Sequence, residues 1–171
     1  HFQSTGHLKS QTTLFAITYN LDVWKTYEQH SDNEWLDKKQ TNIEHKIVPL
    51  LAFARRHRLM IIHLPHRQEI ADEATPLPGE IVCTPRDPDE LQHELLSVLQ
   101  EHQVTTLLYA GYNSNLCVLF RPTGILAMRT LGYQTILIRD CTIAFVPQNF
   151  TSQEERAFLN QFEPLWGITT T

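Results

Sequence analysis

Cys117 is the residue of this chain whose type and position are best suited to chemistry. It follows an apolar, β-rich run at 104–111 and precedes a stretch of helical length that ends at Gly132. A second apolar run lies at 134–139, and two β-runs joined by a helix-length crossover predict a parallel βαβ unit. Ligands bind at the carboxyl ends of parallel strands, and the N–H groups at a helix start stabilise a thiolate. We therefore expect a cysteine nucleophile in the first turn of one helix that runs from about 115 to 132.

The composition is that of a globular protein of moderate size. The 171 residues are 42% hydrophobic and 19% charged, which suits one domain with a full core. The formal net charge of −5 gives no electrostatic reason to expect nucleic acid or an anionic membrane as partner. Three cysteines do not suggest a disulfide framework, so we expect a reducing, cytoplasmic compartment. We expect one domain at 12–171, preceded by a tail at 1–11.

The rest of the chain alternates between β-runs and helical periods. Further β-runs are predicted at 12–17, 59–64, 80–84 and, as a short edge strand, 168–171. Further helices are predicted at 42–57, with a kink at Pro49, at 87–102, and from a capping box that begins at Ser152. This alternation predicts a three-layer α/β/α sandwich with a Rossmann-like, mainly parallel sheet of five or six strands. Neither a G-x-G-x-x-G fingerprint nor a P-loop occurs, and we predict no cofactor.

The segment around Cys117 also carries a specific motif. Residues 111–118 read G-Y-N-S-N-L-C-V, the following helix ends with L-G-Y at 131–133, and the next strand ends with R-D-C-T at 139–142. This resembles the nucleophile segment of the isochorismatase-like cysteine hydrolases, whose usual pattern is G-V-x-T-N-x-C-V after an apolar strand. The resemblance implies a small-molecule substrate, a dimer or tetramer of identical subunits, and a non-proline cis peptide bond near Tyr112–Asn113.

The resemblance also implies a catalytic triad. In that family a cysteine attacks the substrate carbon, an aspartate after the first strand takes the thiol proton, and a lysine after the third strand supports the charges. Backbone N–H groups at the start of the cysteine's helix form the oxyanion hole. The residues matched here are Cys117 as nucleophile, Asp22 as candidate base, Arg86 as candidate charge stabiliser, and Thr18, Tyr112, Asn113 and His63 as candidate substrate-binding residues.

Two members of this triad do not transfer cleanly. Alignment by the apolar run puts Thr18 in the place of the aspartate, whereas a shifted alignment gives that place to Asp22. We prefer the first, because the second draws polar residues into a central parallel strand, and such strands are almost continuously apolar. The lysine position holds Thr84, with Arg86 two residues on, and arginine does not exchange a proton at neutral pH.

The sequence therefore supports two functions of different classes. The leading one is hydrolysis of an amide or related C–N bond through a thioester at Cys117. The alternative is a catalytically silent family member that binds a ligand or serves as an assembly subunit, with Cys117 as a small buried residue. An isochorismatase-type vinyl-ether hydrolase fits poorly, because such enzymes depend on the aspartate. We assign structural roles to Cys83, Cys141, Asp140, Trp24 and Trp166, a solvated helix end to 55–58, and no metal to His63 and His66, whose spacing matches no standard ligand set.

Overall fold

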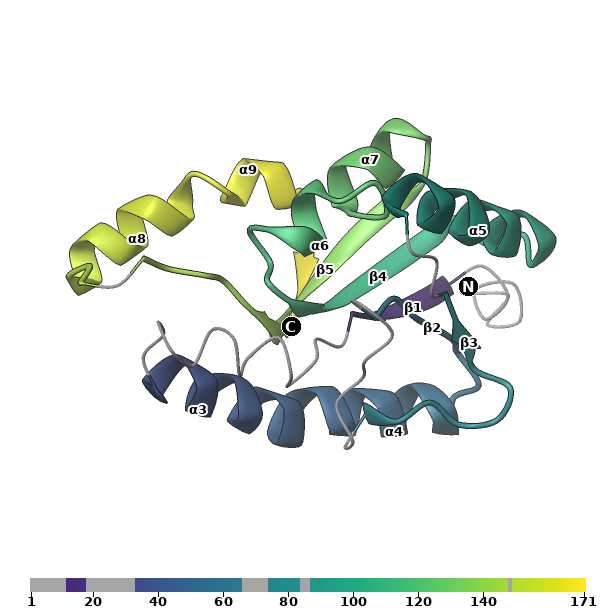
Figure 1. Cartoon of the computed structure of the whole chain (residues 1–171), viewed down its shortest axis with the longest axis horizontal. Coiled ribbons are helices and arrows are strands. Elements are labelled where there is room, and N and C mark those ends of the chain that lie inside the picture. Colours follow the sequence, from purple (N-terminus) through teal and green to yellow (C-terminus); the bar gives the residue numbers. More distant parts are fainter. Residues whose placement is uncertain (1–11, 18–32, 66–73, 84–86, 148) are drawn as a thin grey trace, which may run out of the picture.

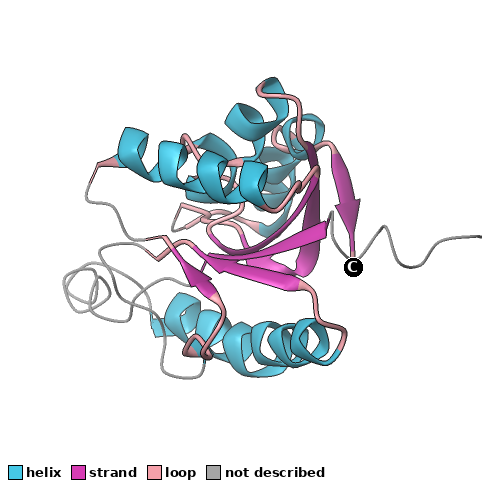
Figure 2. Cartoon of the chain, turned by 90° about the vertical axis from the view of Figure 1, so that its right-hand side faces the viewer, coloured by secondary structure: helices cyan, strands magenta, loops and turns pink. Residues whose placement is uncertain are grey.

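The computed structural model describes residues 12–17, 33–65, 74–83, 87–147 and 149–171. Its sheet has six strands in the order β3-β2-β1-β4-β5-β6, and every neighbouring pair is parallel. Helices cover both faces of this sheet, as Figures 1 and 2 show. The predicted α/β/α sandwich is therefore confirmed. The strands are β1 (Thr12–Ile17), β2 (Met60–His63), β3 (Ile81–Val82), β4 (Thr106–Tyr112), β5 (Gln134–Ile143) and β6 (Ile168–Thr170).

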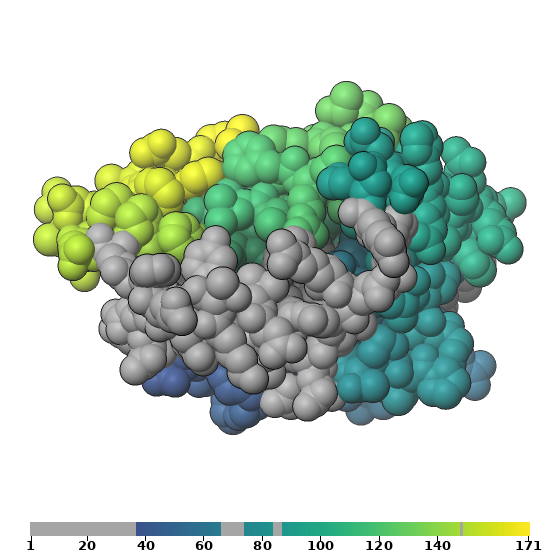
Figure 3. Space-filling view, in the orientation of Figure 1, coloured from purple at the N-terminus to yellow at the C-terminus, as the bar shows by residue number. Residues whose placement is uncertain are grey.

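The helices fall into two groups. One face of the sheet carries α3 (Asn33–Asn42), the π-helical turn η1 (Ile43–Ile47) and α4 (Val48–Arg56). The other face carries α5 (Pro88–Glu101), α6 (Cys117–Phe120), α7 (Ile125–Thr130), α8 (Ser152–Asn160) and α9 (Glu163–Trp166). In the space-filling view of the same orientation, α5 and the C-terminal helices lie at opposite ends of the molecule (Figure 3).

Two hydrophobic clusters form the core, one on each face of the sheet. Alternate residues of β4 enter different clusters, with Leu107 and Tyr109 in one and Ala110 and Tyr112 in the other. Both faces of a central strand are thus buried, which explains why the strands appear in the sequence as apolar runs rather than as alternating patterns.

β5 is longer than the sequence predicted. The pairing with β4 shifts register between Tyr109 and Gly111, after which Gly111 pairs with Thr142 and Tyr112 with Ile143. Because pairing continues past this irregularity, Asp140 lies inside the strand and not at its end. Its carboxylate forms an exposed ion pair with Lys46 at 3.3 Å, and the structural role expected for Asp140 stays a prediction.

The helix that contains Pro49 adapts to the proline by changing its hydrogen-bond pattern. Pro49 lacks an N–H and its ring would collide with the carbonyl four residues earlier in a regular α-helix. The preceding turn, η1, is π-helical, and the Val48 N–H donates to the Ile43 carbonyl. The expected irregularity therefore takes the form of a wider turn just before the proline.

The single crossover helix predicted after Cys117 is wrong, because the chain forms two short helices there. Arg121 is extended, as a residue before proline prefers, and Pro122 cannot continue the first helix. Gly124 then begins the second helix in close contact with the first, since a Cβ there would lie 2.8 Å from the Val118 carbonyl oxygen.

The C-terminal helix is also divided into two, α8 and α9. Its capping box begins at Thr151, one residue before the predicted Ser152, and pairs Thr151 with Glu154. Trp166 is buried at 7% exposure in the core, as expected. Trp24 lies outside the described residues.

Candidate active site

Cys117 lies at the point where the order of strands reverses. From β1 the chain builds β2 and β3 on one side, and then returns to place β4, β5 and β6 on the other. In open α/β sheets, ligands bind outside the carboxyl ends of the strands at this switch point. Cys117 follows β4 there, after a turn that begins at the cis peptide bond between Tyr112 and Asn113. The predicted cis bond is thus confirmed.

Several hydrogen bonds fix the turn that carries the cysteine, residues 113–117. The Asn115 side chain both donates to and accepts from the Phe145 backbone, each at 2.8 Å. The Ser114 N–H donates to the Ile143 carbonyl at 3.0 Å, and the Ser114 carbonyl accepts from the Trp166 indole N–H at 2.9 Å. The turn is therefore held by β5, by the segment that follows it, and by α9.

The backbone N–H groups of Asn113, Asn115 and Cys117 have no hydrogen-bond acceptor among the described residues. The N–H groups of Ser114, Leu116 and Val118 are all engaged in backbone hydrogen bonds. Because α6 has only four residues, its macrodipole is small, and individual N–H groups are what this turn offers to a negative charge.

The three cysteines are all free, and they differ in access to solvent. Cys83 and Cys141 are buried, one in each core cluster, and burial raises the pKa of the Cys83 thiol to about 12 and that of Cys141 to about 11. Cys117 is partly exposed. The packing roles predicted for Cys83 and Cys141 are confirmed, and Cys117 is the thiol that a substrate can reach.

Lys39 on α3 is a buried lysine beside this site, and the sequence patterns did not identify it as a candidate. Only 4% of the residue is exposed, and its Nζ lies 4.6 Å from the centre of the Tyr112 ring. Burial lowers the pKa of Lys39 to about 6, and the electrostatic attraction of Cys117 offsets only part of that shift. A large share of the Lys39 amines is therefore unprotonated at neutral pH. Lys39 also lies close enough to Cys117 for the charge of one group to affect the pKa of the other.

The position of Lys39 follows a pattern that was visible in the sequence. The buried residues of this helical segment recur at every fourth position from Lys39 through Ile43 and Ile47 to Leu51, and then at Ala54. Four residues of an α-helix turn through about 400°, so this spacing drifts around a regular helix. The wider turn η1 reduces the drift. Extending the apolar stripe back by one step would have identified Lys39 as buried.

Tyr112 links Lys39 to the cysteine turn. Its ring is 1% exposed, and its hydroxyl donates to the Asn42 Oδ1 at 2.5 Å. The Asn42 side-chain N–H donates in turn to the Asp140 carbonyl at 2.9 Å. These bonds tie the end of α3 to β4 and β5, which fixes the helix that carries Lys39 against the strands that carry the turn.

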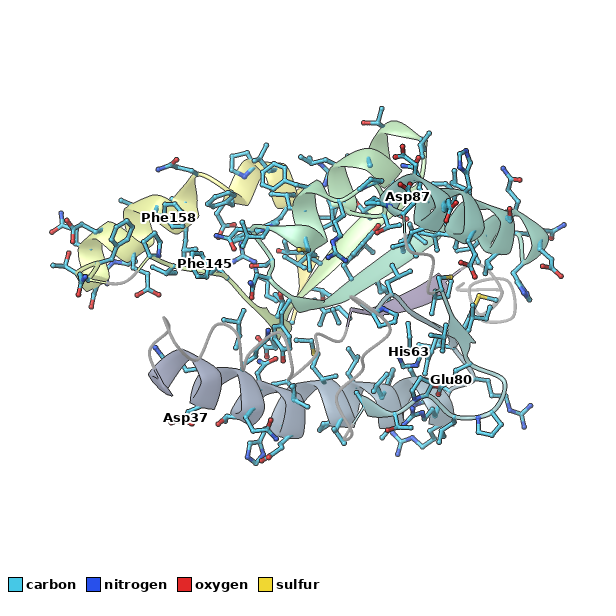
Figure 4. The ribbon with its side chains drawn as sticks, in the orientation of Figure 1. Asp37, His63, Glu80, Asp87, Phe145 and Phe158 are labelled. Atoms are coloured by element: carbon cyan, nitrogen blue, oxygen red, sulfur yellow. The ribbon has the colours of Figure 1, made fainter. Side chains whose placement is uncertain are left out.

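His63, at the end of β2, belongs to a separate polar cluster (Figure 4). It is fully buried, and its Nε2 lies 2.8 Å from the Glu80 Oε2. Arg55 donates two hydrogen bonds to the same carboxylate, at 2.6 and 3.1 Å. The prediction that residues 55–58 form a solvated helix end is therefore wrong for Arg55. No group of three His, Cys, Asp or Glu side chains in the described part of the chain is arranged to hold a metal ion.

The structure brings together Cys117, Tyr112 and Asn113 among the predicted site residues, and places His63 two strands away at the same end of the sheet. The Asn113 Oδ1 is buried with no hydrogen-bond partner among the described residues. The other predicted positions, Thr18, Asp22, Thr84, Arg86 and His66, lie outside the described residues.

The motif, the strand order and the cis bond before Asn113 all point to one family. A model of the isochorismatase domain matches residues 20–171, and the chain belongs to the isochorismatase family. No curated protein matches the chain. None of the described helices is long and apolar enough to cross a membrane.

Solved structures share the fold. An isochorismatase from Pseudomonas putida has a TM-score of 0.64 and 23% identity, over 94% of this chain and 86% of that one. The YcaC gene product of Escherichia coli, an octameric hydrolase of unknown specificity, has a TM-score of 0.61 and 13% identity, over 95% and 76%. YcaC from Pseudomonas aeruginosa, solved with hexane-2,5-diol and covalent acrylamide, has a TM-score of 0.56 and 14% identity, over 95% and 77%.

Proposed function

We propose that this protein is a cysteine hydrolase that cleaves an amide or related C–N bond of a small molecule through a thioester at Cys117. The observation that carries the proposal is the setting of this cysteine. It is the one partly exposed thiol among three, and it stands on a fixed turn at the switch point of the sheet. A cysteine that served only to fill space would be expected in the core, where Cys83 and Cys141 lie.

The backbone of the turn supports a role in acyl transfer. A tetrahedral intermediate on Cys117 carries a negative oxygen that needs hydrogen-bond donors. The N–H groups of Asn113, Asn115 and Cys117 lack acceptors among the described residues and are candidate donors. The assignments of Asp22 as base, Arg86 as charge stabiliser, and Thr18, Tyr112, Asn113 and His63 as substrate contacts stay predictions.

The test is a hydrolysis assay on small primary amides and N-carbamoyl amines that measures ammonia release and traps the acyl-enzyme for mass spectrometry. We expect turnover by the native protein, and a loss of at least about a thousandfold in Cys117→Ala, because the covalent route is removed. Cys141→Ala is the matched control and should retain activity. Acrylamide, itself a primary amide, is a convenient covalent probe for Cys117.

The silent alternative predicts a different result. A ligand-binding or assembly subunit would show no turnover with any amide, and Cys117→Ala would leave ligand binding and assembly unchanged. The missing lysine at Thr84 and the doubtful aspartate favour that alternative, whereas the presence of Lys39 beside Cys117 favours the enzyme.

We also propose that the protein is cytoplasmic, that residues 12–171 form one domain, and that identical subunits assemble. Three free thiols suit a reducing compartment. Assembly is supported by the octamer reported for the Escherichia coli YcaC gene product and by large exposed apolar side chains such as Phe120, which is 55% exposed. Light scattering after size exclusion should give a mass that is a multiple of the monomer, and a monomeric mass across the micromolar range would contradict assembly.

A further inference from the structure

We propose that Lys39 is the proton acceptor of Cys117, and that this lysine, reaching the site from α3, supplies the amine that is missing after the third strand. The inference rests on the proposed function, because it assigns a role in the same site. It is carried by the burial of the Lys39 amine, by its place over the Tyr112 ring, and by the short path from that ring to the cysteine turn.

Lys39 does not follow the usual behaviour of a lysine on a helix. Long charged side chains on helices usually extend to water, and a lysine is rarely buried without a functional or ionic reason. Lys39 instead points inward between α3 and the sheet, where α3 packs against β5. The face of the Tyr112 ring favours a cation, so it lowers the cost of placing a proton on the amine.

Few ionisable groups near Lys39 can exchange a proton with it near neutral pH. The ionisable groups to consider on the surrounding elements are Tyr112, Asp140, Cys141 and Cys117. Burial raises the pKa of the Tyr112 phenol and of the Cys141 thiol, so both stay protonated. The Asp140 carboxylate pairs with Lys46. Among these four groups, Cys117 is therefore the one that can pass a proton to the Lys39 amine, and it lies close enough to interact with the charge of that amine.

The proton balance of the reaction is simple. The Cys117 S–H bond breaks and a Lys39 N–H bond forms, which gives a thiolate and an ammonium. The thiolate attacks the substrate carbonyl, and the ammonium returns the proton to the departing amine as the C–N bond breaks. The neutral amine then takes a proton from the water that hydrolyses the thioester, and returns it to the cysteine sulfur.

The experiment measures the rate at which iodoacetamide alkylates Cys117 from pH 5.5 to pH 10, site by site, by mass spectrometry. This readout needs no substrate. We expect Lys39→Met to slow the alkylation of Cys117 about tenfold or more at pH 7 and to have little effect at pH 10, where the thiolate forms without help. Lys46→Met removes an exposed lysine from the same face and should leave the profile unchanged.

A third variant separates the charge from the proton. Lys39→Arg keeps a cation but cannot act as a base at neutral pH. We expect fast alkylation in this variant, together with hydrolysis that is about a hundredfold slower or worse. A purely structural lysine would not produce this split. Asp22→Asn is measured alongside. If the pH profile of Cys117 alkylation shifts in Asp22→Asn and does not shift in Lys39→Met, the base is Asp22 and the proposal is overturned.

The outcomes separate the two proposals. Alkylation that depends on Lys39, without hydrolysis of any amide, would reject the proposed function and support the pairing of Lys39 with Cys117. Hydrolysis that depends on Cys117, with superimposable alkylation profiles for the native protein and Lys39→Met, would reject the role of Lys39 and leave the proposed function in place.

Discussion

At the scale of single residues, Glu80 holds three parts of the molecule together. Its carboxylate accepts hydrogen bonds from Arg55 on α4, from His63 on β2, and from the Leu77 N–H at 3.0 Å. Burial alone would raise the pKa of Glu80, but the hydrogen bonds from these three residues outweigh burial and lower the pKa to about 2. The carboxylate is therefore ionised, and His63, whose pKa is lowered by burial, donates its Nε2–H to it.

We predict that Glu80→Gln lowers the free energy of unfolding by about 2 kcal/mol at pH 7, because charge-assisted hydrogen bonds to a mostly buried group are lost. Urea denaturation measures this. Glu94→Gln, an exposed change of the same kind, should cost little. In the native protein, the free energy of unfolding should decrease as the pH falls from about 4.5 towards 2. Over this range Glu80 binds a proton in the unfolded chain but stays ionised in the folded protein. An equal pH dependence in Glu80→Gln would contradict this assignment.

The residues of the site differ in how far the sequence could predict them. Cys117, Asn113 and the cis bond between Tyr112 and Asn113 belong to one contiguous motif, and they were predicted together. Lys39 was not, because its contact with the motif exists only after α3 packs against the sheet. A charged residue is also ordinarily assigned to the solvated face of a helix. Burial overrides that assignment here, and only the four-residue spacing hinted at it.

At the scale of elements, the junction between α6 and α7 determines how Cys117 is presented. Gly124 has an ordinary backbone conformation, with φ of −83°, so its requirement is one of space. A Cβ would lie 2.8 Å from the Val118 carbonyl oxygen and 3.0 Å from both the N and the O of Arg121. All three are backbone atoms, one in α6 and two at the residue that ends it, and they cannot move aside without shifting α6.

We predict that Gly124→Ala destabilises the protein by about 1–3 kcal/mol and slows the alkylation of Cys117 several-fold, because overpacking displaces α6. Gly132→Ala is the control. Gly132 has φ of +97° with nothing within 4 Å of its Cβ position, so alanine there costs about 1–2 kcal/mol in backbone conformation without touching the site. Equal effects of the two variants on alkylation would show that the junction does not position Cys117.

The element boundaries show where sequence patterns lose resolution. The positions of β1, β2 and α5 follow directly from apolar runs and helical periods, which are local. The break between α6 and α7 depends on Pro122 and on the close contact at Gly124, whereas the apolar period continues through both short helices. The extension of β5 depends on its pairing with β4 past a register shift, which no local pattern reveals.

At the scale of the whole molecule, the fold class was predictable because the sheet is covered on both faces. Helices on each side leave the central strands without a solvated face, so a central strand such as β4 is a nearly continuous apolar run. Helices also alternate with strands along the chain. The order of the strands leaves no such local pattern, because it is set by which strands pair after the chain crosses over. This order places Cys117 at the reversal point between β1 and β4.

Lys39 also links the site to the stability of the whole molecule. The unfolded chain holds a proton on this lysine up to about pH 10.5, whereas the folded chain releases it near pH 6. Between these values the unfolded state binds more protons, so the free energy of unfolding rises with pH. Below about pH 6.5 the buried His63 adds to the same trend, and above about pH 8.5 the raised pKa values of Cys83 and Cys141 oppose it. The contribution of Lys39 is therefore clearest from pH 6.5 to 8.

We predict that the free energy of unfolding of the native protein rises by about 2 kcal/mol over this interval, and that Lys39→Met removes most of the rise. At pH 7 this variant should be more stable than the native protein, on the order of a few kcal/mol, because methionine needs no desolvation of a charge. Urea denaturation at several pH values measures both effects, with Lys46→Met as the control that keeps the slope. A variant that gains stability while Cys117 loses reactivity would show that the buried lysine is retained for chemistry, and a variant that loses stability at pH 7 would show that it is retained for the fold.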